Sequence, residues 1–250
     1  MSKLAVIILT KNEEKNIEAA IKSAEFADEI LVIDSGSTDR TQEFAEKHGA
    51  RFITRLMDEA GFAGQRNFAL TQTAAEWVFY LDADERITAA ASDDIRQAVI
   101  SIDKVAYKIK RLNIVFGQQM KYGEHGPDWC VRLFPRQSVH WEGAVHESPQ
   151  TQLPVKALTR PLLHYTYTDW DRYFEKFNQY TSLMAKRMLE GGKRASFGDI
   201  LFHPMFAFIR FYFLRLGFLD GKQGLIFALN HYFYTMIKYV KLYYAQREEH

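Results

Sequence analysis

The chain has 250 residues, of which 47% are hydrophobic and 25% are charged, an ordinary composition for a globular protein of one or two domains. Its 32 Lys and Arg residues against 31 Asp and Glu residues give a net charge of +1, which excludes a strong global field for recruiting nucleic acid. The single cysteine, Cys130, excludes an intramolecular disulfide and a zinc site of several cysteines. We therefore expect a cytoplasmic protein that does not bind nucleic acid.

The first hundred residues alternate short apolar runs with amphipathic segments, which is typical of strand and helix units that feed a parallel sheet. The pattern predicts strands at residues 4–9, 29–34, 51–54 and 77–82 and helices at residues 17–24, 41–48 and 62–73. The first apolar run is too short for a secretory signal, because Lys11 follows it almost directly. This part of the chain is predicted to be an α/β half-domain.

The sequence changes character twice after residue 104. Residues 105–163 contain alternating segments separated by Gly, Pro and Asn, which predicts mixed sheet with long loops. After residue 167 only helical segments are expected: one at 169–189, a break at Gly191 and Gly192, and one on either side of 217–224. We therefore expect an α/β domain at residues 1–167, with halves at 1–104 and 105–167, and a helical region at 168–250.

Aromatic residues make up 14% of the chain and are concentrated in the helical region. Basic residues lie among them: Arg210, Arg215, Lys222, Lys238 and Lys241. A membrane-spanning helix needs about 20 consecutive apolar residues, and Arg210 and Arg215 interrupt the best candidate, so we do not expect one. Two alternatives stay open: an interfacial helix at an anionic membrane surface, or a helical cap whose aromatic residues pack on the rest of the protein.

Asp82-Ala83-Asp84 lies where a predicted buried strand ends. Ligands of open α/β sheets bind beyond the carboxyl ends of the strands, and two such carboxylates can share a divalent cation that neutralises a diphosphate leaving group. Taken alone the pair is a weak signal, because acidic residues at strand ends often only cap the next helix.

Other polar residues follow the first two predicted strands. Asp34 ends one of them and is expected to accept a hydrogen bond from a base or a ribose, whereas Asp39, followed by Gln42, fits a capping box. The segment from Thr10 to Glu14 is either a helix start or a nucleotide contact. Its lack of glycine argues against a dinucleotide-binding turn.

Three further features carry possible chemistry. Arg66, at the start of an apolar helix, suits a base edge or a phosphate, although a surface arginine is the simpler alternative. The segment His140 to Glu147 combines His and Glu with Trp141, which suits a base that deprotonates a sugar hydroxyl beside an aromatic face. His164 lies in apolar sequence, where a lone histidine is more often a hydrogen-bonded core residue.

Together, in order, these motifs resemble the family 2 glycosyltransferases of GT-A fold. The segments that carry the resemblance are Ile7-Ile8-Leu9-Thr10-Lys11-Asn12-Glu13, Val32-Ile33-Asp34-Ser35-Gly36-Ser37-Thr38-Asp39, Gly64-Gln65-Arg66-Asn67 and Asp82-Ala83-Asp84. With Trp141-Glu142-Gly143-Ala144-Val145-His146-Glu147 and Gly217-Phe218-Leu219-Asp220-Gly221-Lys222-Gln223-Gly224, the whole chain is similar to the bacterial lipopolysaccharide inner-core β-1,4-glucosyltransferases. The resemblance implies a Rossmann-like mixed sheet with a helical C-terminal extension.

The resemblance also implies an activity and its residues. It implies inverting transfer of a hexose, glucose in this subgroup, from a UDP-sugar to a lipid-linked saccharide, assisted by Mn²⁺ or Mg²⁺. The basic residues among the aromatic ones of the tail separately predict attachment to the inner face of the cytoplasmic membrane, where such an acceptor would be presented. Uridine and diphosphate contacts fall on Thr10, Glu13, Asp34, Arg66 and Asp82. Metal ligands fall on Asp84 and His164, and the catalytic base falls on Glu147. Many relatives carry Asp-Asp where this chain has Asp34-Ser35. The resemblance therefore does not say which of these two positions contacts the uracil and which the ribose.

The acceptor site is the least defined. Its candidate residues are Tyr122, Trp129, Arg132 and Trp141. Three alternative functions share some of these features: a haloacid-dehalogenase-type phosphatase, a nucleotidyltransferase and a non-catalytic membrane-surface module. The first places its Asp pair after an early strand and continues to Thr, whereas Glu85 follows here. The second opens with a Gly-rich basic loop that residues 10–15 lack, and the third would have no need of Asp82, Asp84 and Glu147 together.

Overall fold

The computed structural model describes residues 4–143 and 147–248. Its internal contacts divide the chain into two compact units, Met1–Leu112 with Asp128–His164 and Asn113–Pro127 with Tyr165–His250. The predicted boundary at residue 167 lies close to the division after His164. The grouping of residues 113–127 with the helical region could not be predicted, because their partners, such as Asp220 for Lys121 and Tyr122, lie about a hundred residues later in the chain.

The first unit alternates strands and helices and then continues as mixed sheet. Its first half contains β1 (Leu4–Thr10), α1 (Ile17–Ala24), β2 (Glu29–Asp34), α2 (Thr41–Lys47), β3 (Arg51–Thr54), α3 (Gly61–Thr71), β4 (Trp77–Asp82), β5 (Glu85–Ile87) and α4 (Ala89–Ile100). Its second half contains β6 (Ala106–Val115), β8 (Asp128–Pro135), a 3₁₀ turn η1 (Arg136–Ser138), β9 (His140–Glu142), β10 (Ser148–Gln150), β11 (Val155–Ala157) and β12 (Leu162–Tyr167). β6 and β12 run on into the second unit. The four predicted strands and three predicted helices of the first half are confirmed.

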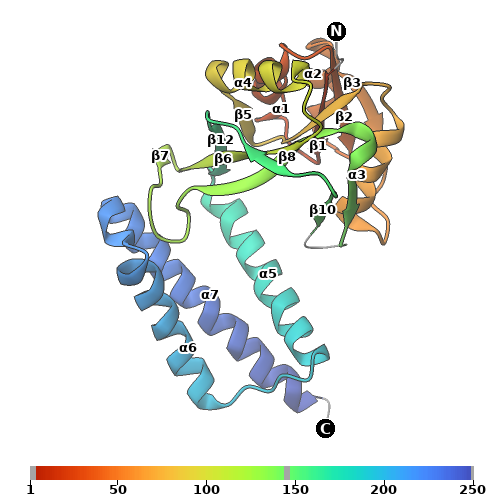
Figure 1. Ribbon diagram of the computed structural model, residues 1–250. Coiled ribbons are helices and arrows are strands. Elements are labelled where there is room, and N and C mark those ends of the chain that lie inside the picture. Colours follow the sequence, from red (N-terminus) through yellow and green to blue (C-terminus); the bar gives the residue numbers. More distant parts are fainter. Residues whose placement is uncertain (1–3, 144–146, 249–250) are drawn as a thin grey trace. The chain divides into compact units, whose positions relative to one another are not determined.

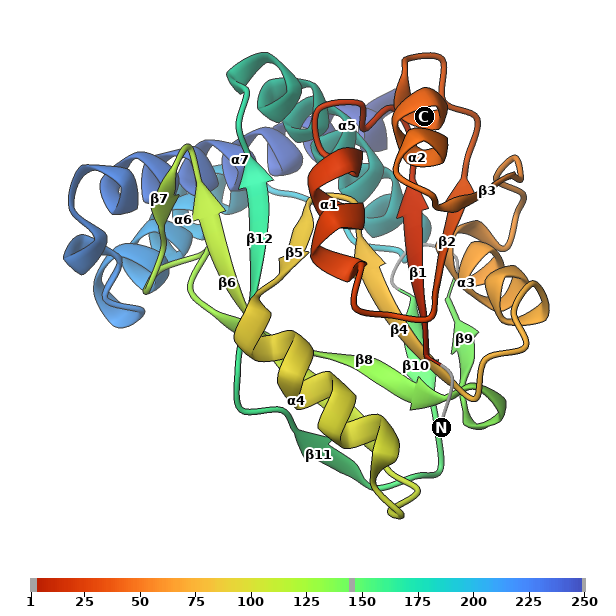
Figure 2. The ribbon, with the colours of Figure 1, turned by 90° about the horizontal axis from the view of Figure 1, so that it is seen from above.

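The strands pair in the order β3-β2-β1-β4-β8-β6-β12-β5. Figure 2 shows β3, β2, β1 and β4 side by side, and these four are parallel. β8 runs antiparallel to both β4 and β6. The predicted mixed sheet is therefore present, and the parallel part places the carboxyl ends of β1, β2 and β4 at one edge.

Alternate residues of the parallel strands build two cores on opposite faces of the sheet. Val6 and Ile8 of β1 pack with residues of α1, α2 and α4. Ile7 and Leu9 of the same strand pack with α3 and with Trp141 of β9. Side chains of a strand alternate between faces, so a buried strand of this kind is apolar throughout. α4 and β5 were not predicted from the sequence, although the buried residues of α4, Ala91, Ile95, Ala98 and Val99, follow helical spacing and the Thr88 hydroxyl caps its start by accepting from Ala91 N.

The second unit consists of three long helices and short connecting segments (Figure 1). It contains β7 (Gln118–Gln119), α5 (Trp170–Glu190), α6 (Phe197–Ile209), a π-helical turn η2 (Arg210–Leu214), a 3₁₀ turn η3 (Gly217–Asp220) and α7 (Gly221–Glu248). α7 contacts both α5 and α6. The predicted break over residues 217–224 is shorter than expected, because α7 already begins at Gly221.

Two glycines allow this early start of α7. A Cβ at Gly224 would lie 1.8 Å from the carbonyl oxygen of Gly217, and a Cβ at Gly217 would lie 2.6 Å from the carbonyl oxygen of Phe211. Only glycine permits such close backbone approach. The Asp220 carboxylate then accepts hydrogen bonds from the backbone N–H groups of Lys121 and Tyr122, which ties segment 113–127 to the helices.

One helical stretch meets the length and composition of a membrane span. It covers Phe197–Leu214, that is α6 and η2 together, and only 11% of it is buried. The expectation that no such segment exists rested on Arg210 and Arg215, but Arg215 lies beyond the stretch and Arg210 is near its end. Length and composition do not distinguish a spanning helix from an interfacial one.

Replacing Gly224 with alanine is expected to destabilise the protein by about 1–3 kcal/mol, because the methyl group would collide with backbone rather than with a flexible side chain. The control is Gly198→Ala in α6, where the nearest atom, Ser196 Oγ, would be 3.5 Å away. Alanine favours a helix over glycine, so this change should be neutral or stabilising. Urea unfolding followed by circular dichroism measures both; equal midpoints for the two variants would contradict the argument.

Candidate functional site

The predicted nucleotide residues lie at the carboxyl ends of neighbouring parallel strands. The strand register pairs Thr10 with Asp34 across β1 and β2, and Leu9 with Asp82 across β1 and β4. The sheet therefore brings Thr10, Asp34 and Asp82 to the same edge, where open α/β sheets bind ligands. The Thr10 hydroxyl is buried and has no hydrogen-bond partner among the described residues.

The turns that follow β1 and β2 are bonded to each other. Asn12 N donates to Ser37 Oγ at 2.8 Å, and Thr38 N donates to Asn12 Oδ1 at 2.8 Å. Asn12 has φ of 53°, a left-handed conformation that asparagine tolerates better than most residues. Glu13 is half-buried beside this contact; its N–H donates to Thr41 Oγ1 at 2.9 Å.

The Asp34 carboxylate organises its own turn. It is 2% exposed and accepts hydrogen bonds from Gly36 N at 2.9 Å, from Ser37 N at 2.8 Å and from the Ser37 hydroxyl. A carboxylate has further lone pairs, so the turn does not exhaust its capacity as an acceptor.

The capping box predicted for Asp39 is wrong. The Asp39 carboxylate accepts from Thr41 N and from Glu14 N, while Gln42 bonds to Glu46 on the helix surface. The residue before α2 is Arg40, which makes no side-chain cap. Burial opposes ionisation of Asp39, but these hydrogen bonds outweigh it and lower its pKa. Its role is structural, as expected, but it joins two turns instead of closing a box.

The start of α3 connects three parts of the site. Gln65 Nε2 donates to Ser35 Oγ at 3.0 Å, in the turn after β2. Asn67 makes a reciprocal pair with Trp141, donating to its carbonyl oxygen and accepting from its N–H, both at 2.8 Å. Arg66, between them, is directed to the carboxylates at the end of β4 and to Glu147. Gln65, Arg66 and Asn67 thus connect α3 to the turn after β2, to the end of β4 and to β9.

The Arg66 guanidinium lies between Asp82 and Glu147. Its Nη2 donates to Asp82 Oδ1 at 3.0 Å and to Glu147 Oε1 at 3.4 Å. Its centre is 4.6 Å from the Trp141 ring and 5.3 Å from the Tyr80 ring, both within cation–π distance. Arg66 is 4% exposed, yet within the described part of the chain its Nε and Nη1 have no hydrogen-bond partner. Buried donors of this kind require an explanation, and a bound anion or base would satisfy them.

Arg132 is buried in this network, which corrects its assignment to an acceptor surface. It is 5% exposed, and its Nη2 donates to Asp82 Oδ2 at 2.6 Å and to Glu85 Oε1 at 2.7 Å. Arg111 donates to the same Glu85 oxygen at 3.2 Å and pairs with Asp128 at 2.6 Å. Arg132 therefore fixes the Asp82 carboxylate from the side opposite to Arg66.

The pKa values of Asp82 and Glu85 shift in opposite directions. Burial favours a neutral Asp82, but the guanidinium groups of Arg132 and Arg66 outweigh it and hold the pKa of Asp82 well below its usual range. Burial, followed by the nearby Asp82 charge, raises the pKa of Glu85 against the opposing effect of Arg132. Glu85 is fully buried, and its Oε2 accepts from Asp82 N at 2.9 Å. It was overlooked as a site residue, although its place directly after Asp84 was a signal.

Asp84 and His164, the predicted metal ligands, are brought together. His164 Nε2 lies 3.4 Å from Asp84 Oδ2, because β12 pairs antiparallel with β5 and sets His164 opposite Glu85. Both side chains are half-buried. In the described residues no group of three His, Cys, Asp or Glu side chains could hold a metal ion. One carboxylate and one imidazole suit Mn²⁺, provided that substrate phosphates and water supply the other ligands.

The remaining acceptor candidates have different environments. Trp141 is 5% exposed and packs edge-on against Tyr80 at 4.9 Å, so the prediction of an open aromatic face for a sugar ring is wrong. Trp129 is 49% exposed with Lys108 over its ring. Tyr122 belongs to the second unit, where its N–H donates to Asp220. Glu147 directly precedes β10, which pairs with β9, whereas Ala144, Val145 and His146 of the same motif lie outside the described residues.

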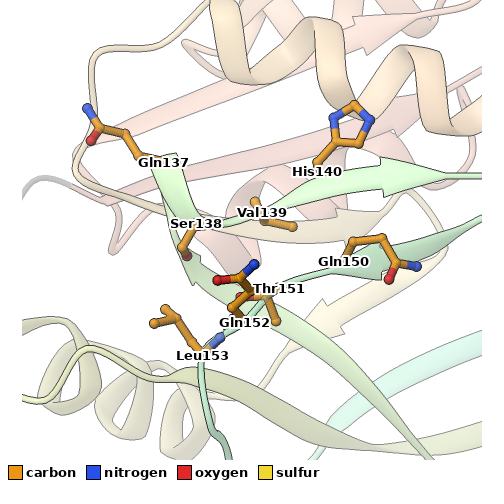
Figure 3. Close-up of a pocket in the computed structure, with 8 residues that line it drawn as sticks. All are labelled: Gln137, Ser138, Val139, His140, Gln150, Thr151, Gln152 and Leu153. Atoms are coloured by element: carbon orange, nitrogen blue, oxygen red, sulfur yellow. Dashed lines mark hydrogen bonds between the residues drawn. The ribbon is translucent and has the colours of Figure 1, made fainter.

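A hollow of about 630 Å³ lies beside the β9–β10 hairpin (Figure 3). Its lining includes Gln137, His140, Gln150 and Gln152. These polar side chains come from η1, β9, β10 and the loop after β10. His140 belongs to the segment in which a base was expected, but the lining includes none of the residues assigned to the nucleotide, the metal or the catalytic base, so the candidate site stays at the strand ends.

Comparison with known proteins agrees with the motifs. Residues 5–137 match the model of Glycosyl transferase family 2. The lipopolysaccharide core biosynthesis glycosyltransferase LpsC of Rhizobium meliloti (strain 1021) is 32% identical over 96% of this chain and 92% of its own length. An uncharacterized glycosyltransferase of Rickettsia typhi is 28% identical over 97% of this chain and 87% of its own length. Glucosyl-3-phosphoglycerate synthase from Mycobacterium tuberculosis, solved in complex with Mn²⁺ and UDP, has a TM-score of 0.37 at 23% identity, covering 46% of this chain and 45% of that one.

Replacing Glu85 with glutamine is expected to destabilise the protein by about 3 kcal/mol, because Arg132 and Arg111 would lose a fully buried anionic partner. The matched control is Asp103→Asn, which breaks the exposed ion pair with Lys156 and should change stability little. Urea midpoints of the two variants provide the measurement. A Glu85→Gln variant as stable as the wild-type protein would show that the negative charge of Glu85 does not stabilise the fold through Arg132 and Arg111.

Proposed function

The chain belongs to glycosyl transferase family 2 and has its GT-A fold, and from this we propose that it transfers a hexose, glucose, from a UDP-sugar to a lipid-linked saccharide such as the lipopolysaccharide inner core, with inversion at the anomeric carbon. The observation that carries the proposal is the buried Arg66, which joins Asp82 to Glu147 and keeps two unused N–H donors. The name of the Rhizobium meliloti relative supports the choice of a lipopolysaccharide core acceptor.

The donor nucleotide would bind across the strand ends. The unpartnered Thr10 hydroxyl, the Glu13 carboxylate and the remaining lone pairs of Asp34 provide polar groups for a uracil and a ribose. The unused donors of Arg66 suit a base carbonyl or a phosphate oxygen. Asp82 would serve as an acceptor near the diphosphate, since Arg132 and Arg66 keep it ionised.

Asp84 and His164 would hold the divalent cation, Mn²⁺ or Mg²⁺. Bound between them and the diphosphate, the cation would neutralise the charge that develops on the leaving group. The contribution of the protein is to keep a carboxylate oxygen, in the turn that leads directly into β5, adjacent to an imidazole nitrogen on β12, the strand paired with β5. A short, paired strand is a more rigid support than a free loop.

Glu147 would act as the general base. Inversion requires a single displacement, in which an acceptor hydroxyl attacks the anomeric carbon from the face opposite to the leaving diphosphate. Glu147 accepts the hydroxyl proton, and its side chain is held by Arg66 at 3.4 Å while remaining 20% exposed. Trp129, with its exposed ring, is the acceptor candidate of the first unit.

The second unit would hold the enzyme on the cytoplasmic face of the membrane, where a lipid-linked acceptor is presented. Large apolar residues of α6 are at least 39% exposed: Phe197, Leu201, Phe202, Met205, Phe206 and Ile209. Arg210 follows them directly, and Arg215 comes just after η2. An exposed apolar face bordered by basic residues suits the headgroup region of an anionic leaflet.

Asp84→Ala and Glu147→Gln are each expected to abolish transfer from UDP-sugars in the presence of Mn²⁺ or Mg²⁺. Loss of a general base costs about 10²–10⁴-fold in rate. The control is Glu142→Gln, which removes an exposed carboxylate from β9, in the same segment as Glu147, and should retain activity. Transfer at the wild-type rate by either site variant would refute the proposal and favour a nucleotide-sugar-binding module without catalysis.

Phe202→Ser combined with Phe206→Ser should reduce flotation of the full-length protein with anionic liposomes, because the two side chains are among the most exposed of the α6 face. Arg210→Gln with Arg215→Gln should lower binding to anionic liposomes more than to neutral ones, at about 1 kcal/mol per residue. Phe174→Ser on α5, 52% exposed, serves as the control. Peripheral attachment would be contradicted if the wild-type protein did not bind anionic liposomes at low salt. It would also be contradicted if an alkaline wash failed to remove the bound protein from the membrane.

A further inference from the structure

The second unit contains a pocket of about 210 Å³ that the proposed reaction does not use. Helix α5 contributes Tyr173, Lys176, Phe177 and Tyr180 to its wall. Their spacing of three, four and seven residues places them on one face of the helix. α7 contributes His231 and Tyr234 in the same way, from one turn of helix.

Aromatic rings form much of the wall and are fixed against each other. The Tyr173 and Phe177 rings are 6.4 Å apart, and the Phe177 and Tyr234 rings meet edge to face at 5.5 Å. Tyr173 is 8% exposed, whereas Tyr180 is 49% exposed at the rim. Rings held in this way present flat apolar surfaces at little further cost in conformational entropy.

Polar groups of different kinds are placed among the rings. Glu124 Oε1 lies 2.7 Å from His231 Nδ1, and the Lys176 ammonium provides a donor on α5. Burial, followed by the negative charge of Glu124, raises the pKa values of Tyr173 and Tyr234. Their hydroxyls are therefore protonated at neutral pH and serve as donors and acceptors without charge.

This combination selects among possible occupants. An organic cation would gain from the aromatic faces but would meet Lys176, and Glu124 is already engaged by His231. An anion would meet Glu124, and an alkyl chain would offer no hydrogen bond to the tyrosine hydroxyls of the wall. A neutral ring with hydroxyls at its edges and C–H groups on its faces satisfies both parts of the wall.

We propose that this pocket binds one saccharide ring, a pyranose of the acceptor. Its volume is below the ~300–1,000 Å³ of sites for drug-sized ligands, which limits the occupant to a single small ring. The inference rests on the proposed function insofar as that function makes the acceptor a saccharide. The pocket adds a second site for binding a saccharide, and all of its lining residues belong to the second unit.

The test uses the full-length protein without donor or metal. Methyl β-D-glucopyranoside and methyl α-D-mannopyranoside are titrated and observed by saturation-transfer NMR, with tetramethylammonium as the cationic probe. Saturable binding of at least one glycoside is expected. Tyr180→Ala should weaken it about fivefold, the worth of one aromatic contact, while Tyr180→Phe keeps the ring and should retain it. Because Tyr180 is half-exposed, neither change threatens folding.

Tyr244→Ala is the matched control, since Tyr244 is 61% exposed and lies on α7 away from the pocket wall. The inference is overturned if neither glycoside saturates, if Tyr180→Ala and Tyr244→Ala bind equally, or if tetramethylammonium binds and the glycosides do not. Glycoside binding without transfer from any UDP-sugar would count against the proposed function alone. Transfer without glycoside binding would count against the pocket alone.

Discussion

The buried ion pairing of Arg66 is the interaction on which the rest of the site depends. Its guanidinium joins Asp82, at the end of a strand, to Glu147, 81 residues away from Arg66 in the chain. Two carboxylates this close would repel each other if no cation lay between them, and a lone buried arginine would be unstable. The Arg66 guanidinium therefore allows the carboxylates of Asp82 and Glu147 to lie close together. The arginine in turn is held by aromatic rings on two other segments and by the position of its helix.

The surroundings of Arg66 show why several charged groups can lie together in the interior of the protein. Arg132, Glu85, Arg111 and Asp128 continue the alternation of charge away from the strand end, so each buried ion faces an opposite one. Gln65 and Asn67 fix the backbone on either side of Arg66. Fixed charges of this kind need no reorganisation when a substrate arrives, which is the main physical advantage of a folded catalytic site over water. The same fixing keeps Nε and Nη1 of Arg66 buried without a hydrogen-bond partner among the described residues.

Much of this arrangement could be predicted from the sequence, and the rest could not, for physical reasons. The grouping of Asp34 and Asp82 was predictable, because each ends a parallel strand and the carboxyl ends of parallel strands lie at one edge of the sheet. Arg132 and Trp141 were assigned to an open surface because composition alone cannot tell a buried polar or aromatic residue from an exposed one. The network around Glu85 depends on pairing between β8, β6 and β4, which is non-local. Likewise, nothing local in residues 113–127 reveals that Asp220 binds their backbone.

The aromatic residues of the second unit are divided between a buried core and an exposed face. Phe227 and Tyr173 are buried and pack with Val115 and Met120, so part of the excess is a core that a small three-helix unit needs. Phe202 and Phe206 are exposed, and no described residue of their own unit covers them. Burying aromatic rings in one place and exposing them in another, on adjoining helices, is not expected of a core that is merely incomplete. Such segregation supports the proposal that the α6 face contacts an anionic surface, because the basic residues Arg210 and Arg215 come after the exposed rings in the chain.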